Sequence, residues 1–97
     1  MATNKDYLTY VLELLREVSG ISYKKMMGEY ILYKNGVIFG GIYDNRFLVK
    51  NITALEEYHL KEAIPYPKGK PMLLVDIEDS ETIKEIVDLL YKELRNK

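Results

Sequence analysis

Several residue types and patterns are absent from this chain of 97 residues, and each absence narrows its class. There is no cysteine, which excludes disulfide bonds, cysteine nucleophiles and thiolate metal sites. No apolar run approaches the roughly 18 residues of a membrane-spanning helix, and the polar start of the chain lacks the apolar stretch of a secretory signal. We therefore expect a cytoplasmic protein that binds no membrane.

Net charge and histidine are also scarce. The 14 basic and 15 acidic residues leave a formal charge of −1, so nucleic-acid contact would need a local basic patch. His59 is the only histidine, and no sequence pattern gives it the hydrogen-bonded partner that a general base requires. We predict that the chain is not an enzyme and has no catalytic residues, no metal and no cofactor.

Three short apolar runs, rich in β-branched and aromatic residues, dominate the middle of the chain. They cover residues 30–33, 37–43 and 47–49, and Asn35-Gly36 and Asp44-Asn45 separate them. The runs are too short for helices, and Asn-Gly supplies the positive φ angles of a type I′ hairpin turn. This pattern predicts a three-stranded antiparallel meander.

Helical spacing of apolar residues flanks the meander. It predicts a first helix over 4–19, with Gly20 as its C-terminal cap, and a last helix, capped by Asp79 or Ser80, whose apolar stripe runs over 83–94. Thr53 and Glu56 match a capping box before a short helix over about 54–61, and 72–75 is typical of a fourth strand. The predicted fold is a single α+β domain over 1–97, an antiparallel four-stranded sheet in the order α-βββ-α-β-α with helices on one face.

Two-residue turns would fix the pairing of Tyr33 with Ile38, Leu32 with Phe39, Tyr43 with Arg46 and Ile42 with Phe47. The face under the helices is then predicted to carry Ile31, Tyr33, Ile38, Gly40, Ile42, Phe47 and Val49. The opposite face would carry Tyr30, Leu32, Phe39, Gly41, Tyr43, Arg46, Leu48 and Lys50, a mixture typical of protein interfaces. Two alternatives stay open: loops or a helix cover this second face, or a bulge at Gly40-Gly41 exchanges the faces beyond it.

Two sets of residues are candidates for contact with a partner. The interface set, for an unidentified protein or for a homodimer, is Tyr7, Tyr10, Leu14, Tyr30, Phe39, Tyr43 and Arg46. The anion or nucleic-acid set, which Arg46 would join, is Lys24, Lys25, Lys50, Lys68 and Lys70. We expect DNA binding by this chain alone to be weak and non-specific, because so few cations neutralise only a few phosphates. Met26-Met27 has two readings, a pliable contact patch or, more commonly, core filling.

A family resemblance adds to this picture. Lys24-Lys25-Met26-Met27-Gly28, the strands at 30–33 and 47–50, and Lys68-Gly69-Lys70-Pro71-Met72 together resemble the N-terminal domain of TfoX/Sxy proteins, over about residues 6 to 95. The family usually has Phe and Gly where Met27 and Glu29 stand, and its two-domain members continue beyond this chain's end. The resemblance implies a secretion-chaperone-like α+β fold and an association with the regulation of bacterial competence. It favours a non-enzymatic protein-interaction module, with a transcription-linked accessory that contacts nucleic acid as the alternative.

Overall fold

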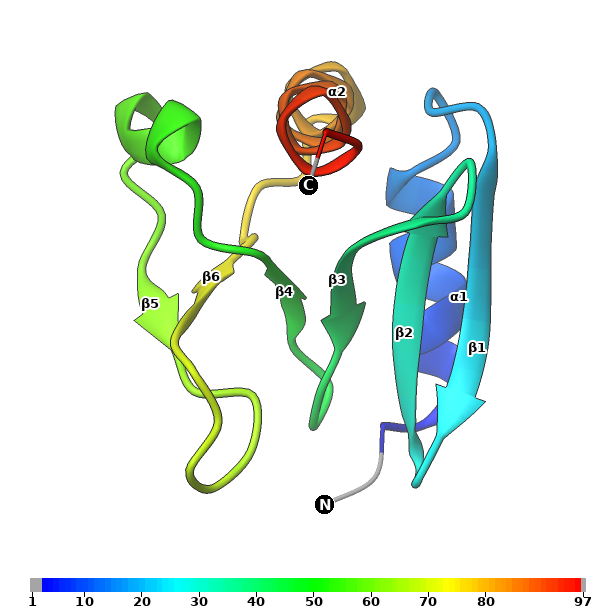
Figure 1. Ribbon diagram of the computed structural model, residues 1–97. Coiled ribbons are helices and arrows are strands. Elements are labelled where there is room, and N and C mark those ends of the chain that lie inside the picture. Colours follow the sequence, from blue (N-terminus) through cyan, green and yellow to red (C-terminus); the bar gives the residue numbers. More distant parts are fainter. Residues whose placement is uncertain (1–2, 97) are drawn as a thin grey trace.

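A computed structural model describes residues 3–96 as an antiparallel sheet packed against helices (Figure 1). The sheet order is β1-β2-β3-β4-β6-β5, and every neighbouring pair is antiparallel. The strands are β1 (Ile21–Met26), β2 (Glu29–Lys34), β3 (Val37–Ile42), β4 (Phe47–Val49), β5 (Glu62–Ala63) and β6 (Met72–Leu74). The helices are α1 (Lys5–Leu14), the 3₁₀-helix η1 (Thr53–Tyr58) and α2 (Ser80–Leu94). The α+β class is confirmed, but the prediction of four strands is wrong because β1 and β5 also belong to the sheet.

Strand β1 is the larger omission. Five of its six residues are exposed, so no alternation of buried and exposed positions marks it in the sequence. It nevertheless pairs with β2 along its whole length, through a turn in which Met27 and Gly28 both have positive φ. Lys24 and Lys25 give this edge strand a charge that discourages pairing with other chains.

The two hairpin turns of the meander form as predicted. Asn35 and Gly36 have φ angles of 48° and 81°, the pair of positive values that a type I′ turn requires. Asp44 and Asn45 repeat the pattern at 53° and 57°, and the residues on either side of them exchange backbone hydrogen bonds of 2.9 and 3.1 Å. The turn chemistry therefore fixes the order and direction of β2, β3 and β4.

A bulge in β3 decides which residues face the helices. Tyr33 pairs with Ile38 as predicted, but Leu32 pairs with Gly40, so Phe39 is an extra residue that the partner strand does not match. The predicted pairing of Leu32 with Phe39 is wrong. Because side chains alternate along a strand, one extra residue exchanges the two faces of the sheet beyond it.

The predicted faces are consequently inverted in β2 and the first part of β3. Ile38, expected under the helices, is 40% exposed on the other side of the sheet. Beyond the bulge the prediction holds, and Ile42 pairs with Phe47 as expected. The sheet residues in the core against the helices are Tyr30, Leu32, Phe39, Ile42, Phe47, Val49 and Leu73.

Local side-chain chemistry sets the helix boundaries. The Asn4 side chain caps α1 by accepting from the backbone N–H of Tyr7 at 2.8 Å, and the helix ends at Leu14, five residues before the predicted end. The segment that follows turns back through a bond of 2.9 Å from the Val18 N–H to the Leu15 carbonyl, so both side chains still reach the core.

Of the two predictions for the later helices, the cap of α2 is confirmed and the capping box of η1 is wrong. Asp79 caps α2, as expected, by accepting from a backbone N–H at 3.3 Å and from the Thr82 hydroxyl at 2.6 Å. The capping box predicted at Thr53 and Glu56 is wrong, because η1 begins after Ile52 without a side-chain cap bond. A 3₁₀-helix replaces the expected α-helix there, and it ends where His59 adopts a left-handed conformation.

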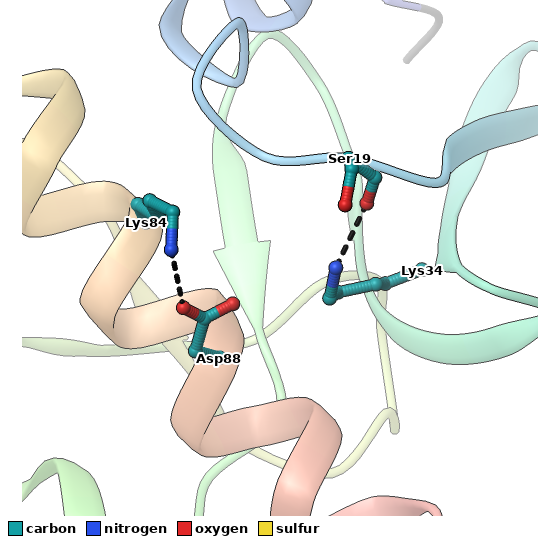
Figure 2. A network of polar contacts seen from close by, with 4 residues as sticks. All are labelled: Ser19, Lys34, Lys84 and Asp88. Carbon is teal, nitrogen blue, oxygen red and sulfur yellow. Dashed lines mark hydrogen bonds and ion pairs between the residues drawn. The ribbon is translucent and has the colours of Figure 1, made fainter.

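Lys34 links the sheet to the helix layer. Lys34 is only 8% exposed, and its Nζ donates to the Ser19 carbonyl at 2.8 Å (Figure 2). The same Nζ lies 5.5 Å from the centre of the Tyr91 ring. Figure 2 also shows the ion pair of Lys84 with Asp88 on α2, at 2.9 Å. A carbonyl and an aromatic ring thus compensate the buried ammonium of Lys34, which is part of the fold and not of a binding surface.

Candidate interaction surface

The sheet face turned away from the helices, here called the open face, meets the loop over residues 64–71. Strand alternation from the observed register puts Ile31, Ile38 and Leu48 on this face. Tyr66, from the middle of the loop, meets Tyr43 with ring centres 6.1 Å apart and planes tilted by 57°. The loop therefore covers part of the open face and leaves hollows on both sides of this tyrosine pair.

Arg46 holds the loop in place. Its Nη2 donates to the carbonyls of Ile64 and Pro65 at 3.0 and 3.4 Å, and its Nε donates to the carbonyl of Tyr43 at 3.1 Å. A guanidinium presents its donors in a fixed planar fork, which suits several fixed carbonyls at once. Arg46 is thus engaged with the loop, and it does not line the basic hollow beside the tyrosine pair.

Tyr43, the inner member of the tyrosine pair, is uncharged at neutral pH. Burial raises the pKa of Tyr43, and the nearby Tyr66 and Glu29 raise it further, because a phenolate would be poorly solvated and close to other negative charge. Tyr66 itself is 58% exposed. The pair presents an aromatic surface with polar hydroxyl tips, the kind of surface that is enriched at protein interfaces.

The first hollow beside the tyrosine pair is basic, and we call it the lysine groove. Its volume is about 640 Å³. Its lining is Ile38, Gly40, Tyr43, Lys50, Asn51, Pro65, Tyr66, Lys68, Gly69, Lys70, Pro71 and Met72. Three ammonium groups and no carboxylate belong to this set, so the groove is positive although the whole chain is not.

The second hollow is mostly apolar, and we call it the methionine groove. Its volume is about 770 Å³. Its lining is Met26, Met27, Glu29, Ile31, Tyr43, Tyr66 and Pro67. Glu29 is already engaged, since its carboxylate accepts from the Thr3 hydroxyl at 2.7 Å and from the Asp44 backbone N–H at 3.1 Å. What remains for a ligand is an apolar floor with two flexible thioether side chains.

The predicted interface set does not come together. Leu14, Tyr30 and Phe39 are buried in the core at 7%, 6% and 0% exposure, so their assignment to a contact surface is wrong. The inverted faces explain Tyr30 and Phe39, and Leu14 belongs to the stripe of α1 that packs on the sheet.

The remaining members of that set lie on two sides of the molecule. On α1, Tyr7 packs partly against the core, while Tyr10 is 42% exposed and its hydroxyl donates to Glu78 at 3.3 Å. Tyr43 and Arg46 belong to the open face instead. No single surface contains all four residues.

The cations predicted for an anion or nucleic-acid patch also lie in two separate places. Lys50, Lys68 and Lys70 line one groove, whereas Lys24 and Lys25 lie on edge strand β1 and outside that lining. Within residues 3–96, none of the three groove lysines has a side-chain hydrogen bond or an ion pair. Half of the six suggested cations therefore form a local basic site.

Sequence reasoning left the role of Met27 open between two readings and missed the role of Tyr66. Met27 is 95% exposed, so the reading of this residue as core filling is wrong, and the signal was its place before Gly28 in a tight turn. Tyr66 stands between Pro65 and Pro67, a pattern that indicated a loop but not that the loop folds onto the sheet.

Comparisons with known proteins give little further guidance. No family model matches the chain. The chain is similar to an uncharacterized 12.7 kDa protein in the trpE 5′ region of Spirochaeta aurantia, with 29% identity over 91 residues, which are 90% of this chain and 79% of that protein. In residues 3–96, no helix is long and apolar enough to cross a membrane.

Proposed function

We propose that this protein is a non-enzymatic cytoplasmic interaction module that binds another protein through the open face of its sheet. One observation carries the proposal. In residues 3–96, seven large apolar or aromatic side chains are prominently exposed, and five of them lie on or beside this face: Met26, Met27, Ile38, Ile64 and Tyr66. Exposed apolar patches on small proteins commonly mark contact sites.

The methionine groove supplies the apolar part of the contact. Unbranched thioether side chains adapt their shape to a ligand, as on other surfaces that accept varied apolar partners. A hollow of about 770 Å³ accommodates several apolar side chains of a partner. Beside it, Tyr43 and Tyr66 add aromatic area at a small cost in conformational entropy.

The resemblance to TfoX/Sxy N-terminal domains supports a regulatory setting. Two of the motifs that carry it, Lys24-Lys25-Met26-Met27-Gly28 and Lys68-Gly69-Lys70-Pro71-Met72, border the methionine groove and the lysine groove. We extend the proposal to a competence-regulator-like role, in which the module contacts another component of a regulatory assembly.

Selection of peptides from a random displayed library tests the proposal. Immobilised wild-type protein should enrich peptides that lose at least about tenfold in affinity on Met27→Ser, since the exposed thioether packs against them. Tyr10→Ser, an exposed change on α1, is the matched control and should leave binding unchanged. Failure to enrich any peptide sensitive to Met27→Ser would contradict the methionine groove as the apolar part of the binding surface.

Self-association is a separate outcome of the same surface. Light scattering at about 100 μM measures it, and we expect a monomer. A dimer that Met27→Glu dissociates would make the partner a second copy of this chain, because in a two-fold interface one substitution acts on both sides.

A second candidate function, contact with nucleic acid, is favoured only by the convergence of Lys50, Lys68 and Lys70 beside Tyr66. Three cations release few counterions, so affinity for DNA at physiological salt should be low and independent of sequence. Fluorescence anisotropy with a labelled oligonucleotide at several salt concentrations measures this. Sub-micromolar, sequence-selective binding would make nucleic acid the principal ligand.

A further inference from the structure

We infer that the partner segment is acidic at one end, with carboxylate side chains in the lysine groove and apolar side chains in the methionine groove. The inference rests on the proposed function, because it names the chemistry of the segment that the open face binds. Three observations support the inference: the positive charge of the lysine groove, the apolar lining of the methionine groove, and Tyr43 and Tyr66, which line both grooves.

The lysine groove has an unsatisfied charge. Lys50, Lys68 and Lys70 line it without a carboxylate in the lining and, within the described part of the chain, without an ion-pair partner. Elsewhere the structure shows that lysine and acid do meet when they are near, as Lys84 and Asp88 do at 2.9 Å. Three like charges around one hollow favour an anionic ligand over an empty site.

The backbone of the loop presents two of these lysines. The Gly69 N–H donates to the Tyr66 carbonyl at 2.8 Å, which closes a turn, and Lys68 within it has a φ of 70°. A Cβ atom at position 69 would lie 3.0 Å from the Tyr66 ring, so glycine is what allows the ring and the turn to pack this closely. The turn thus places Lys68 and Lys70 beside an aromatic ring on the groove wall.

The two grooves are neighbours, with Tyr43 and Tyr66 in the lining of both, and together we call them the track. An extended segment of roughly six residues spans about 20 Å. This length fits the molecule, whose principal extents are 29, 28 and 25 Å. A segment with apolar residues followed by acidic residues can therefore fill both grooves while it crosses the tyrosine pair.

A second copy of this chain fits the track less well. The acidic stretch over 76–79 lies on the helix side, where Glu78 accepts from the Tyr10 hydroxyl at 3.3 Å, and the lysine groove is on the opposite side of the sheet. Docking that stretch into the groove of another copy would make a head-to-tail contact, which leads to a ring or a filament and not to a two-fold dimer. A foreign segment is the consistent occupant.

Nucleic acid is also less consistent with the track. Single strands are held by a series of aromatic platforms and a long basic channel, whereas this groove offers Tyr66 as its one prominently exposed ring. The adjoining methionine groove has no role in binding a phosphate backbone. An acidic and apolar peptide uses both hollows.

The test uses peptides that are selected on the wild-type protein, synthesised with a fluorophore and measured by fluorescence anisotropy. Lys50→Gln, Lys68→Gln and Lys70→Gln are combined in one groove variant. The charge-matched control combines Lys5→Gln, Lys61→Gln and Lys92→Gln, three exposed lysines outside the lining of both grooves. Circular dichroism checks that both variants are folded, as expected for exposed side chains.

We expect the enriched peptides to combine acidic and apolar residues and to bind the groove variant at least about tenfold more weakly than the wild type. Their binding to the groove variant should also lose most of its dependence on salt concentration. The control variant should change affinity by less than about threefold. Replacing the peptide's acidic residues by their amides should weaken binding to the wild type but not to the groove variant, since the two changes remove the same interaction.

Three results would overturn the inference: enriched peptides without acidic residues, equal affinity for the groove variant, or an oligonucleotide that binds the groove more tightly than the peptides do. Binding that depends on Met27 but not on the lysines would leave the proposed function standing and reject the acidic partner. Absence of any enriched peptide that depends on either groove would reject both.

Discussion

Replacing Phe39 by alanine should destabilise the protein far more than replacing its neighbour Ile38. Phe39 is the extra residue of the β3 bulge and is fully buried, whereas Ile38 is 40% exposed on the open face. A phenylalanine buries about 150–250 Å². At about 25 cal/mol per Å², and with a cavity left behind, Phe39→Ala should cost about 3–5 kcal/mol. Ile38→Ala should cost about 1 kcal/mol, since much of that side chain is already in water.

Urea denaturation followed by circular dichroism measures the difference. With an m-value of about 1.5 kcal/mol/M, Phe39→Ala should lower the midpoint by roughly 2–3 M, and Ile38→Ala by less than about 1 M. The two substitutions are adjacent in one strand, so each controls for general effects of alanine on a β-strand. Equal costs, or a larger cost for Ile38→Ala, would contradict the bulge and restore the unbulged register.

Three further outcomes are expected. Gly40→Ala should cost about 2–3 kcal/mol in urea denaturation, because a Cβ atom there would collide with the Leu48 carbonyl oxygen of β4, and a neutral effect would show that the strands separate easily. Arg46→Gln should speed tryptic cleavage in the loop over 64–71 relative to wild type, since the loop loses its guanidinium hydrogen bonds; unchanged cleavage would assign the loop's order to other contacts. A hydrogen bond from the Thr82 hydroxyl lowers the pKa of Asp79, so the ionised carboxylate stabilises the fold fully above its unfolded pKa of about 3.9, and this stabilisation is lost as pH falls through the folded pKa. Asp79→Asn keeps a capping oxygen but does not titrate, so it should remove this part of the acid dependence of stability. A pH profile of stability identical to that of the wild type would refute this role of Asp79.

Residues that act locally made much of the fold predictable. Asn35-Gly36 fixed a turn that needs positive φ, and Asp79 fixed the start of α2, because each of these effects operates within a few residues. Strand β1 was not predicted because both of its faces are exposed. It is an edge strand that contains lysines, so its sequence shows no alternation of apolar and polar residues. Burial pattern is the main signal by which sequence reveals a strand, and here there was none.

The candidate surface was predictable only in part, because a shift of one residue in the pairing of β2 with β3 decides which side chains lie on the open face. The sequence placed Tyr43 on the surface correctly, yet assigned Tyr30 and Phe39 to the same face, and the bulge moves both into the core. The sequence offered a bulge at Gly40-Gly41 as an alternative, and the observed bulge lies one residue earlier, at Phe39. The convergence of Lys50 with Lys68 depends on how a proline-rich loop folds back on the sheet, a long-range contact that no local pattern encodes.

Nuclear magnetic resonance most directly tests the claim that the open face binds a protein segment. A peptide enriched on the wild-type protein is titrated into isotopically labelled protein, and backbone amide shifts are mapped onto the structure. The account predicts the largest changes at Met27, Ile38, Lys50 and the loop over 64–71, with small changes along the exposed side of α1 and α2. Shifts concentrated on those helices, with the open face unaffected, would contradict it.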